Sequence, residues 1–231
     1  MRPYTQQINL SNQSATLVAL AQQIASAGNL TLTANAANID SSGSARILLL
    51  TTTENDSGVN YTIVGLDADG NSITETGALP NNTTKSSTKA YASVSKISLS
   101  AGITANMSVG TVNSTLTAYS TTIPLDFYAR TGASAITEIT GTIVYTVQET
   151  FDDLLGQGSL NAIWYDGSLS NDTQNTSGGG TVGANLLALS SVNGRSQLDK
   201  GATGVRIKII SYSNGATLKL RLITEANTDM G

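Results

Sequence analysis

Residues 205–224 read VRIKIISYSNGATLKLRLIT, and this stretch decides the fold class. Apolar side chains alternate with charged or polar ones on both sides of Asn214-Gly215, which is the period of a half-buried β-strand. An Asn-Gly pair between two such runs is a strong β-hairpin signal, because these residues adopt the positive φ angles that a tight turn requires. The sequence therefore predicts a hairpin at 205–224. The same alternating pattern indicates a β-rich chain.

The predicted turn also sets which residues share a face. A two-residue turn places Ile209 opposite Leu220, and in that register six apolar residues share one face of the hairpin, while Ile210 and Ile223 lie on the other face. The other face is basic, and we expect it to be solvated, with contact to an acidic partner as the alternative. The apolar face carries Val205, Ile207, Ile209, Leu218, Leu220 and Leu222, and the basic face carries Arg206, Lys208, Lys219 and Arg221.

Short alternating runs separated by Gly, Asn and Asp continue through most of the chain. The clearest lies at 61–76, where two β-rich runs flank the turn Asp67–Asn71. Residues 136–147 fit either one long strand or a pair of strands. The remaining expected strands are 30–33, 45–53, 90–100, 107–111, 114–119, 124–129, 162–165 and 186–190.

This pattern predicts a mainly β protein with two antiparallel β-sandwich or jelly-roll-like modules. A break before Pro124 separates the modules, at residues 14–122 and 123–231. Residues 1–13 are expected to form an extended N-terminal arm, because Pro3 disfavours a helix there, and residues 8–10 of this arm could pair as an edge strand.

One short N-terminal helix is expected at residues 14–28. Ser14 suits the N-cap and Gly28 suits the position after the last turn. The alternative is a strand, because the residues that follow favour β structure. The helical spacing is carried by Leu17, Leu20, Ala21, Ile24 and Ala25.

The composition excludes several chemistries. The 231 residues include no histidine and no cysteine, so Ser-His-Asp hydrolysis, Cys-His chemistry and structural zinc sites are closed to this chain. Charged residues make up 12%, about half the usual share, and the net charge is −4. A surface of neutral hydroxyls and amides suits contact with other protein, and a polar, stable monomer is the alternative. We expect no enzyme activity, no cofactor, no nucleic acid and no membrane partner.

Three short motifs resemble chemical sites, and each has a simpler interpretation. Asp67–Asn71 resembles the start of a calcium loop, but Ser72 occupies the position that requires glycine, so a plain turn is favoured over a metal site. The carboxylates of Glu149, Asp152 and Asp153 are interpreted as a strand end or partner contact rather than an acid/base pair. Residues 178–180 are three glycines without the lysine of a phosphate-binding loop. We therefore expect no catalytic and no metal-binding residues.

The candidate contact residues lie in two places. Trp164 and Tyr165 form the only aromatic pair that includes tryptophan, and either anchor a core or interface or offer a platform for a sugar ring. The N-terminal arm and the polar loop 168–183 are the other candidate contact segments. The residues expected to contact a partner are Arg2, Pro3, Tyr4, Ile8, Leu10, Trp164 and Tyr165.

Several stretches resemble a family of structural proteins of tailed-bacteriophage virions. In the first module these are GVNYTIVGLDADGNSITETGA (58–78) and STKAYASVSKISLSAGITANMSVG (87–110). In the second they are IPLDFY (123–128), TIVYTVQETFDD (142–153) and AIWYDGS (162–168). The last stretch departs from the family pattern at Gly167, where that pattern commonly carries histidine.

The resemblance implies a virion component built from β-sandwich modules and present in many copies. Among virion components, a capsid decoration or cement protein is the leading hypothesis, bound as a homotrimer to the major capsid protein of a particle assembled in the host cytoplasm. A component of the head–tail neck or the tail is the second hypothesis. A carbohydrate-binding receptor or adhesin module that uses Trp164 and Tyr165 is the third.

Overall fold

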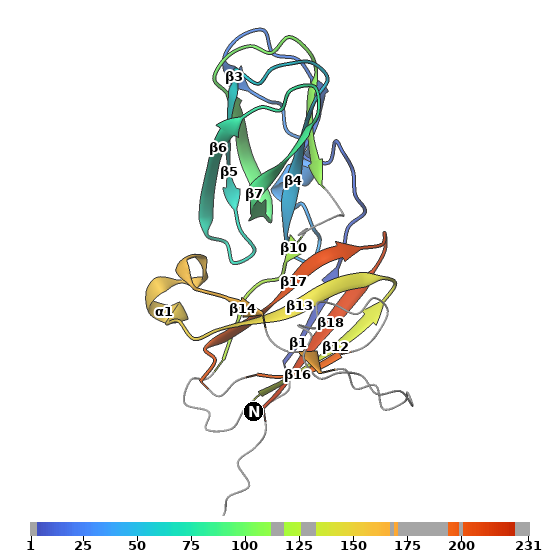
Figure 1. Ribbon diagram of the computed structural model, residues 1–231, viewed down its shortest axis with the longest axis vertical. Coiled ribbons are helices and arrows are strands. Elements are labelled where there is room, and N and C mark those ends of the chain that lie inside the picture. Colours follow the sequence, from blue (N-terminus) through green and yellow to red (C-terminus); the bar gives the residue numbers. More distant parts are fainter. Residues whose placement is uncertain are drawn as a thin grey trace, which may run out of the picture. The chain divides into compact units, whose positions relative to one another are not determined.

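The computed structural model describes residues 4–111, 118–125, 133–166, 169–170, 194–198 and 201–224. The protein is mainly β, with antiparallel sheets and only short helices, as predicted (Figure 1). It divides into two compact units. We call residues 10–121 the N-terminal unit, and residues 1–9 with 122–231 the C-terminal unit.

Two antiparallel sheets build the N-terminal unit, and the 3₁₀ helix η1 (Ala34–Ala37) accompanies them. The first sheet has the order β2-β9-β4-β7, with the short β10 also on β4. Its strands are β2 (Ala19–Gln22), β4 (Ala45–Thr52), β7 (Thr84–Tyr91), β9 (Met107–Thr111) and β10 (Ala118–Tyr119). The second sheet has the order β3-β8-β5-β6. Its strands are β3 (Gly28–Asn29), β5 (Asn60–Leu66), β6 (Ser72–Ala78) and β8 (Ser93–Leu99). The core includes Leu48, Leu50, Tyr61, Ile63, Tyr91, Ile97, Met107 and Val109.

The hairpin predicted at 61–76 is confirmed. β5 and β6 pair continuously from Asn60↔Ala78 to Leu66↔Ser72. Asp67 closes the turn itself, because its Oδ1 accepts hydrogen bonds from the backbone N–H groups of Asp69 and Asn71 at 2.9 and 2.8 Å. This local Asx-turn geometry explains the motif without a bound ion.

The helix predicted at 14–28 is wrong, and the alternative of a strand is correct for part of it. Residues 19–22 form β2, which pairs with β9. Gly110 on β9 lets the chain just before β2 lie against the same strand, since a Cβ at that position would lie 1.9 Å from the carbonyl oxygen of Ser14. Pairing and burial against β9 override the helical spacing of the apolar residues, as tertiary context often does.

Side chains join the two facing edges of the N-terminal unit, β6 and β7. Glu75 on β6 is buried and accepts hydrogen bonds from the backbone N–H groups of Thr88 and Lys89 on β7 at 2.9–3.0 Å, and from the hydroxyl of Tyr61 at 2.9 Å. In the other direction, Lys89 Nζ donates to the carbonyl of Thr74 at 2.8 Å, and Lys85 Nζ to that of Ala78 at 2.9 Å. These bonds replace a backbone ladder between the two strands. We call them the β6–β7 lacing.

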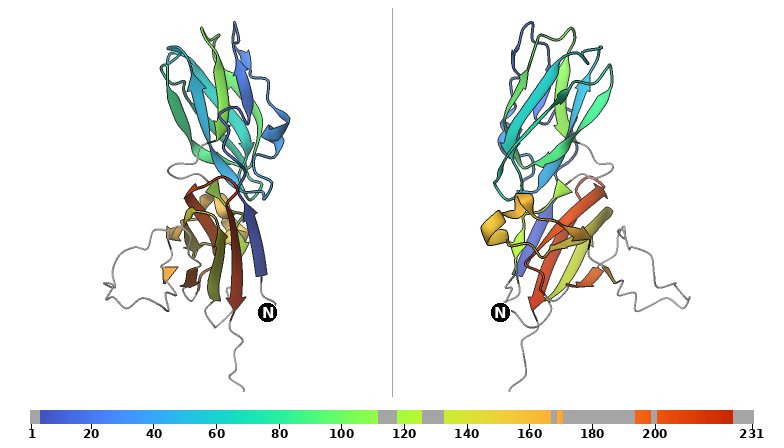
Figure 2. Two further views of the ribbon diagram at one scale, coloured as in Figure 1. Left: turned by 90° about the vertical axis from the view of Figure 1, so that its right-hand side faces the viewer. Right: turned by 60° about the vertical axis from the view of Figure 1, so that its left-hand side comes forward.

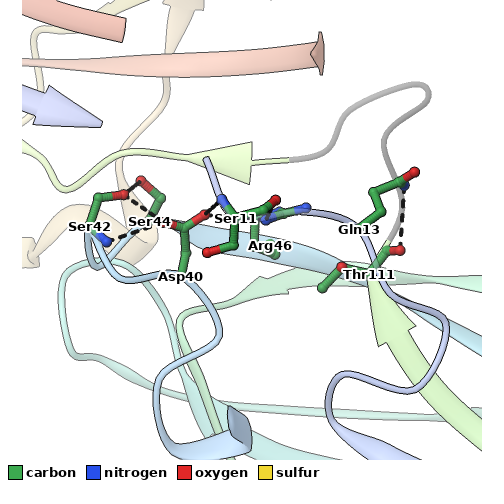
Figure 3. A network of polar contacts seen from close by, with 7 residues as sticks. All are labelled: Ser11, Gln13, Asp40, Ser42, Ser44, Arg46 and Thr111. Atoms are coloured by element: carbon green, nitrogen blue, oxygen red, sulfur yellow. Dashed lines mark hydrogen bonds and ion pairs between the residues drawn. The ribbon is translucent and has the colours of Figure 1, made fainter. Parts of the chain in front are cut away.

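A second buried polar network holds the start of the N-terminal unit (Figure 3). Arg46 on β4 forms an ion pair with Asp40 at 3.2 Å, and both side chains are completely buried. Asp40 also accepts hydrogen bonds from the backbone N–H of Ser11 and from the hydroxyl of Ser42. A buried ion pair needs such extra partners to offset its desolvation. Ser11 is therefore fixed to β4 two residues after β1 ends.

The C-terminal unit also contains two antiparallel sheets. One has the order β1-β18-β12-β16-β15, and the other has β14-β13-β17 with β11 paired to β17. The strands of the first sheet are β1 (Tyr4–Asn9), β12 (Ala133–Thr140), β15 (Leu169–Ser170), β16 (Gly194–Gln197) and β18 (Thr217–Thr224). Those of the second are β11 (Ile123–Pro124), β13 (Ile143–Thr150), β14 (Tyr165–Asp166) and β17 (Gly204–Tyr212). The predicted strand 186–190 and most of the predicted loop 168–183 lie outside the described residues.

The hairpin predicted at 205–224 is wrong in its pairing and right in its turn and its buried face. The turn is present, with Gly215 at φ +74° and Ala216 N–H donating to the carbonyl of Ser213 at 3.1 Å. However, β17 pairs with β13, while β18 pairs with β1 and β12 in the other sheet. The chain therefore crosses from one sheet to the other at this turn. All six residues predicted to share the apolar face are buried, on the two strands that the turn joins.

Residues 136–147 repeat this arrangement. They form two strands, β12 and β13, that lie in different sheets and are joined at Gly141, which has φ +79°. The two crossings contact each other, because Thr142 N–H donates to Ser213 Oγ at 3.1 Å and Ser213 N–H donates to the carbonyl of Thr142 at 2.9 Å. Stacking the strands face to face buries their apolar sides against one another, which a flat hairpin does not do.

The predicted N-terminal arm is divided between the two units: residues 1–9 belong to the C-terminal unit and residues 10–13 to the N-terminal unit. Residues 4–9 form β1, which pairs with β18 along its whole length from Tyr4↔Leu222 to Asn9↔Thr217. Ile8 is completely buried beneath this sheet. Residues 4–9 of the predicted arm are therefore an edge strand, which pairs over a longer stretch than the expected residues 8–10.

Candidate protein-interaction surface

After β13 the chain leaves its sheet, forms the short helices α1 (Leu154–Gln157) and η2 (Ser159–Asn161), and returns as β14 (Figure 1). Two aspartates shape this excursion. Asp153 caps α1 by accepting from the backbone N–H groups of Leu155 and Gly156 at 3.0 and 3.1 Å. Asp152 accepts from the backbone N–H of Ile163 and so closes the loop. These carboxylates therefore have structural roles, whereas the neighbouring Glu149 is buried on β13.

Large apolar side chains on this excursion point into solvent. Leu155 is 98% exposed, while its neighbour Leu154 packs over Gly204, where an added Cβ would lie 2.4 Å from Leu154 Cδ1. Phe151 and Tyr165 contact each other edge to face with ring centroids 5.9 Å apart. Five of the nine large hydrophobic residues that are exposed among the described residues fall within these fifteen positions, so they mark a site rather than scattered exposure. We call them the 151–165 patch: Phe151, Leu155, Leu160, Ile163 and Tyr165.

Trp164 lies beside the patch and is held by a polar cluster. The guanidinium of Arg206 lies over its ring, 4.1 Å from the centroid, and donates from Nε to Gln148 Oε1 at 2.8 Å. Gln148 in turn donates to Asp166 Oδ1 at 2.8 Å, and Asp166 forms an ion pair with Lys208 at 3.5 Å. Arg206 and Lys208, which the sequence placed on a solvated basic face, therefore fix Trp164 and β14. Since Arg206 covers one face of the indole, that face is not open to a sugar ring.

The other predicted contact residues are dispersed. Tyr165 belongs to the patch, and Tyr4 is about half exposed on β1, whereas Arg2 and Pro3 lie outside the described residues. Ile8 and Leu10 are buried, at 0% and 4% exposure, and are core residues rather than exposed contacts. Sequence reasoning missed Phe151, Leu155, Leu160 and Ile163. The sequence signal that could have identified them is the run 151–165, which is rich in large apolar residues whose spacing fits neither a helix nor a strand.

No group of three or more acidic side chains that could hold a metal ion occurs within the described part of the chain. In the same residues, no helix is long and apolar enough to cross a bilayer. The predicted glycine motif at 178–180 lies in the undescribed segment 171–193.

In comparisons with known proteins, no protein-family model, no curated protein and no solved structure matches this chain.

Proposed function

We propose that this protein is a structural component of a bacteriophage virion, and specifically a decoration or cement protein that binds the major capsid protein on the outside of the head. The observation that carries the proposal is the 151–165 patch. Its apolar side chains are exposed, and covering them with another surface lowers the free energy. The mainly β fold, the low charge and the resemblance to virion proteins all support it. In this proposal the protein is a binding component without enzymatic activity.

The mechanism is mechanical. A cement protein contacts neighbouring capsomers and carries part of the load that the packaged genome places on the shell. Each contact can be weak, because an oligomer that engages several sites at once binds with a high effective concentration. A homotrimer suits threefold and quasi-threefold positions of an icosahedral shell. The patch supplies the apolar centre of each contact, with Asp152 and Asp153 at its base.

Attachment to heads tests the proposal. Heads of the encoding phage that lack this protein are mixed with the purified chain, and the bound amount is measured by mass spectrometry and cryo-electron microscopy. Leu155→Asp should reduce occupancy at least about tenfold, because it places a carboxylate in the buried centre of the contact. Leu20→Asp is the matched control, since Leu20 is also exposed, at 61%, but lies on β2 outside the patch. Its occupancy should equal that of the wild type.

The same measurement separates the alternatives. Hundreds of copies per particle support decoration, whereas about a dozen copies at one vertex place the protein in the neck or tail. Equal occupancy of Leu155→Asp and the wild type would remove the patch from the contact. Absence of the protein from purified particles would overturn the proposal as a whole.

A further inference from the structure

The 151–165 patch carries acidic groups and no basic group of its own. Within residues 151–165 the only charged side chains are those of Asp152 and Asp153. Each accepts a hydrogen bond from the backbone of a patch residue: Asp153 Oδ1 from Leu155 N–H at 3.0 Å, and Asp152 Oδ2 from Ile163 N–H. The two negative charges therefore lie directly beside the apolar side chains of the patch.

Each of these carboxylates keeps one oxygen for a partner. In the part of the chain that the structure describes, Asp153 Oδ2 and Asp152 Oδ1 accept no hydrogen bond, and neither carboxylate forms an ion pair. Asp153 is exposed and Asp152 is partly exposed. The basic side chains around β14 are engaged elsewhere, since Lys208 pairs with Asp166 at 3.5 Å and Arg206 lies over the indole ring. The charge that the patch offers to a partner is therefore negative.

This charge distinguishes the surfaces that could cover the patch. A second copy that docks with the same face brings its own carboxylates against these two, and like charges repel. A bilayer of anionic lipids repels them for the same reason. A protein pocket that is apolar inside and has lysine or arginine at its rim covers the apolar side chains and also forms charge-assisted hydrogen bonds with the carboxylates.

We infer that the 151–165 patch binds an apolar pocket of its protein partner that is rimmed by lysine or arginine side chains. Leu155, which is 98% exposed, enters the pocket, and the two free carboxylate oxygens accept from the basic rim. Leu154 packs over Gly204 and so fixes the base of the excursion. In the right-hand view of Figure 2 the excursion, in gold, projects from the strands of its own unit. The inference deepens the proposed function and rests on it only in taking the partner to be the capsid protein.

Two synthetic peptides test the chemistry of the partner without phage particles. Both are amphipathic helices with the same leucines and no tryptophan, and their polar positions carry lysine in one and glutamate in the other. Trp164 is the only tryptophan of the chain and lies between Ile163 and Tyr165, so its fluorescence reports binding at the patch. At low ionic strength the full chain should bind the lysine peptide at least about tenfold more tightly than the glutamate peptide.

A leucine variant tests whether the peptide binds at the patch. Leu155→Ser removes apolar area without changing the charge, and should weaken binding of the lysine peptide several-fold. Leu20→Ser is the matched control on β2, outside the patch, and should bind like the wild type.

Asparagine variants test the two carboxylates. Asp152→Asn/Asp153→Asn removes both charges but keeps an oxygen for each backbone N–H group, and asparagine caps a helix as well as aspartate does. The preference for the lysine peptide should fall to roughly twofold. Glu54→Gln/Asp69→Asn is the matched control, because it changes the net charge by the same amount at exposed residues of the N-terminal unit. This control should keep the wild-type preference.

The same variants test the partner itself on heads that lack the protein. Charges at the rim of a contact act mainly on the rate of association and on its salt dependence. At low salt Asp152→Asn/Asp153→Asn should therefore attach several-fold more slowly than the wild type, and added salt should slow it less. Glu54→Gln/Asp69→Asn should attach at the wild-type rate.

Three results with the peptides would overturn the inference. They are equal affinity of the wild type for both peptides, an equal loss of preference in the two double variants, and tighter binding to phosphatidylglycerol vesicles than to the lysine peptide. Attachment to heads that requires Leu155 but is unchanged by Asp152→Asn/Asp153→Asn would also overturn it and leave the proposed function intact. Conversely, a chain that prefers the lysine peptide through its patch but attaches to no head supports the inferred chemistry and overturns the proposed function.

Discussion

At the scale of single residues, Glu75 joins more elements than any other side chain of the β6–β7 lacing. Its carboxylate lies on β6, receives two backbone N–H groups of β7, and holds the hydroxyl of Tyr61 on β5. Gly77 makes room for that tyrosine, since a Cβ at that position would lie 2.9 Å from the Tyr61 hydroxyl oxygen. A buried carboxylate with this set of donors stabilises the fold only while all its donors remain satisfied.

Glu75→Ala should lower the free energy of unfolding by about 2 kcal/mol or more, because it removes the acceptor of two backbone N–H groups on β7 and leaves the buried hydroxyl of Tyr61 without its partner. Urea unfolding of the N-terminal unit, followed within the full chain, measures the change. Thr76→Ala is the control on the same strand; Thr76 is exposed, and we expect a change within about 0.5 kcal/mol. Similar values for the two variants would contradict the role assigned to Glu75.

Three buried tyrosines predict loss of stability at alkaline pH. Burial, and then the hydrogen bond to Glu75, raise the pKa of Tyr61 above its ordinary value; burial, and then the charge of Glu75, do the same for Tyr91. Burial also raises the pKa of Tyr145, which the hydrogen bond to Thr137 partly opposes. The unfolded chain releases these protons near pH 10, whereas the folded chain retains them, so stability is complete below about pH 10 and falls as the pH rises further.

The expected slope above that pH is about 1.4 kcal/mol per pH unit for each of the three tyrosines. Urea unfolding at increasing pH, with tyrosinate absorbance recorded in parallel, measures it. A free energy of unfolding that stays constant up to about pH 12 would contradict the burial of these hydroxyl groups.

At the scale of elements, the contrast between Asn214-Gly215 and Asp67–Asn71 shows what local sequence determines. Both turns were predicted and both are present, because turn geometry depends on nearby residues. Only the second joins two strands that pair with each other. Pairing across the first is prevented by β12, β13 and β1, which are distant in sequence and offer the two strands other partners. The alternation of residues 205–224 predicted the buried face but carried no information on these partners.

The same reasoning applies to the segment 14–28 and to the patch. The apolar spacing of Leu17 to Ala25 suits one face of a helix, and only contact with β9 selects a strand. The five patch residues were not predicted as a set, because exposure of an apolar side chain is decided by how the excursion between β13 and β14 folds back. Tyr165 alone was identified from its residue type.

Gly215→Val tests the crossing between the sheets of the C-terminal unit. Space is not limiting, as no atom lies within 4 Å of a Cβ built there, but φ is +74°. A β-branched residue in that conformation costs about 1–2 kcal/mol or more, so the midpoint of thermal unfolding of this unit should fall. Gly215→Asn is the matched variant, because asparagine tolerates positive φ, and its midpoint should lie much closer to the wild-type value. Equal midpoints for the two variants would contradict the turn geometry.

At the scale of the whole molecule, the C-terminal unit is formed by two separate segments of the chain, and the N-terminal unit lies between them in the sequence. Residues 1–9 belong to the same compact unit as residues 122–231. The C-terminal unit, which bears the 151–165 patch, is therefore completed by β1, and Ile8 is part of its core. The sequence indicated that residues 8–10 could pair as an edge strand, but it did not identify the partner, because β18 lies more than two hundred residues away in the sequence.

Deletion of residues 1–9 should destabilise the C-terminal unit selectively. It removes the neighbour of β18 and uncovers the apolar positions 218, 220 and 222, so amide hydrogens of β18 should exchange at least about tenfold faster. The amides of β5 and β6 in the N-terminal unit serve as the internal reference and should keep their wild-type rates. Unchanged exchange in β18 would show that β1 contributes little to its sheet.

The position of β1 also has a consequence for biosynthesis. Residues 4–9 leave the ribosome before β18, the strand with which they pair, which is made about two hundred residues later. At about 5–20 residues per second, the nascent chain carries β1 unpaired for roughly ten seconds or more, while residues 10–121 are already available to fold. The sheet of the C-terminal unit that joins β1 to β18 is therefore completed only after β18 has been synthesised, so this unit folds later than residues 10–121 can.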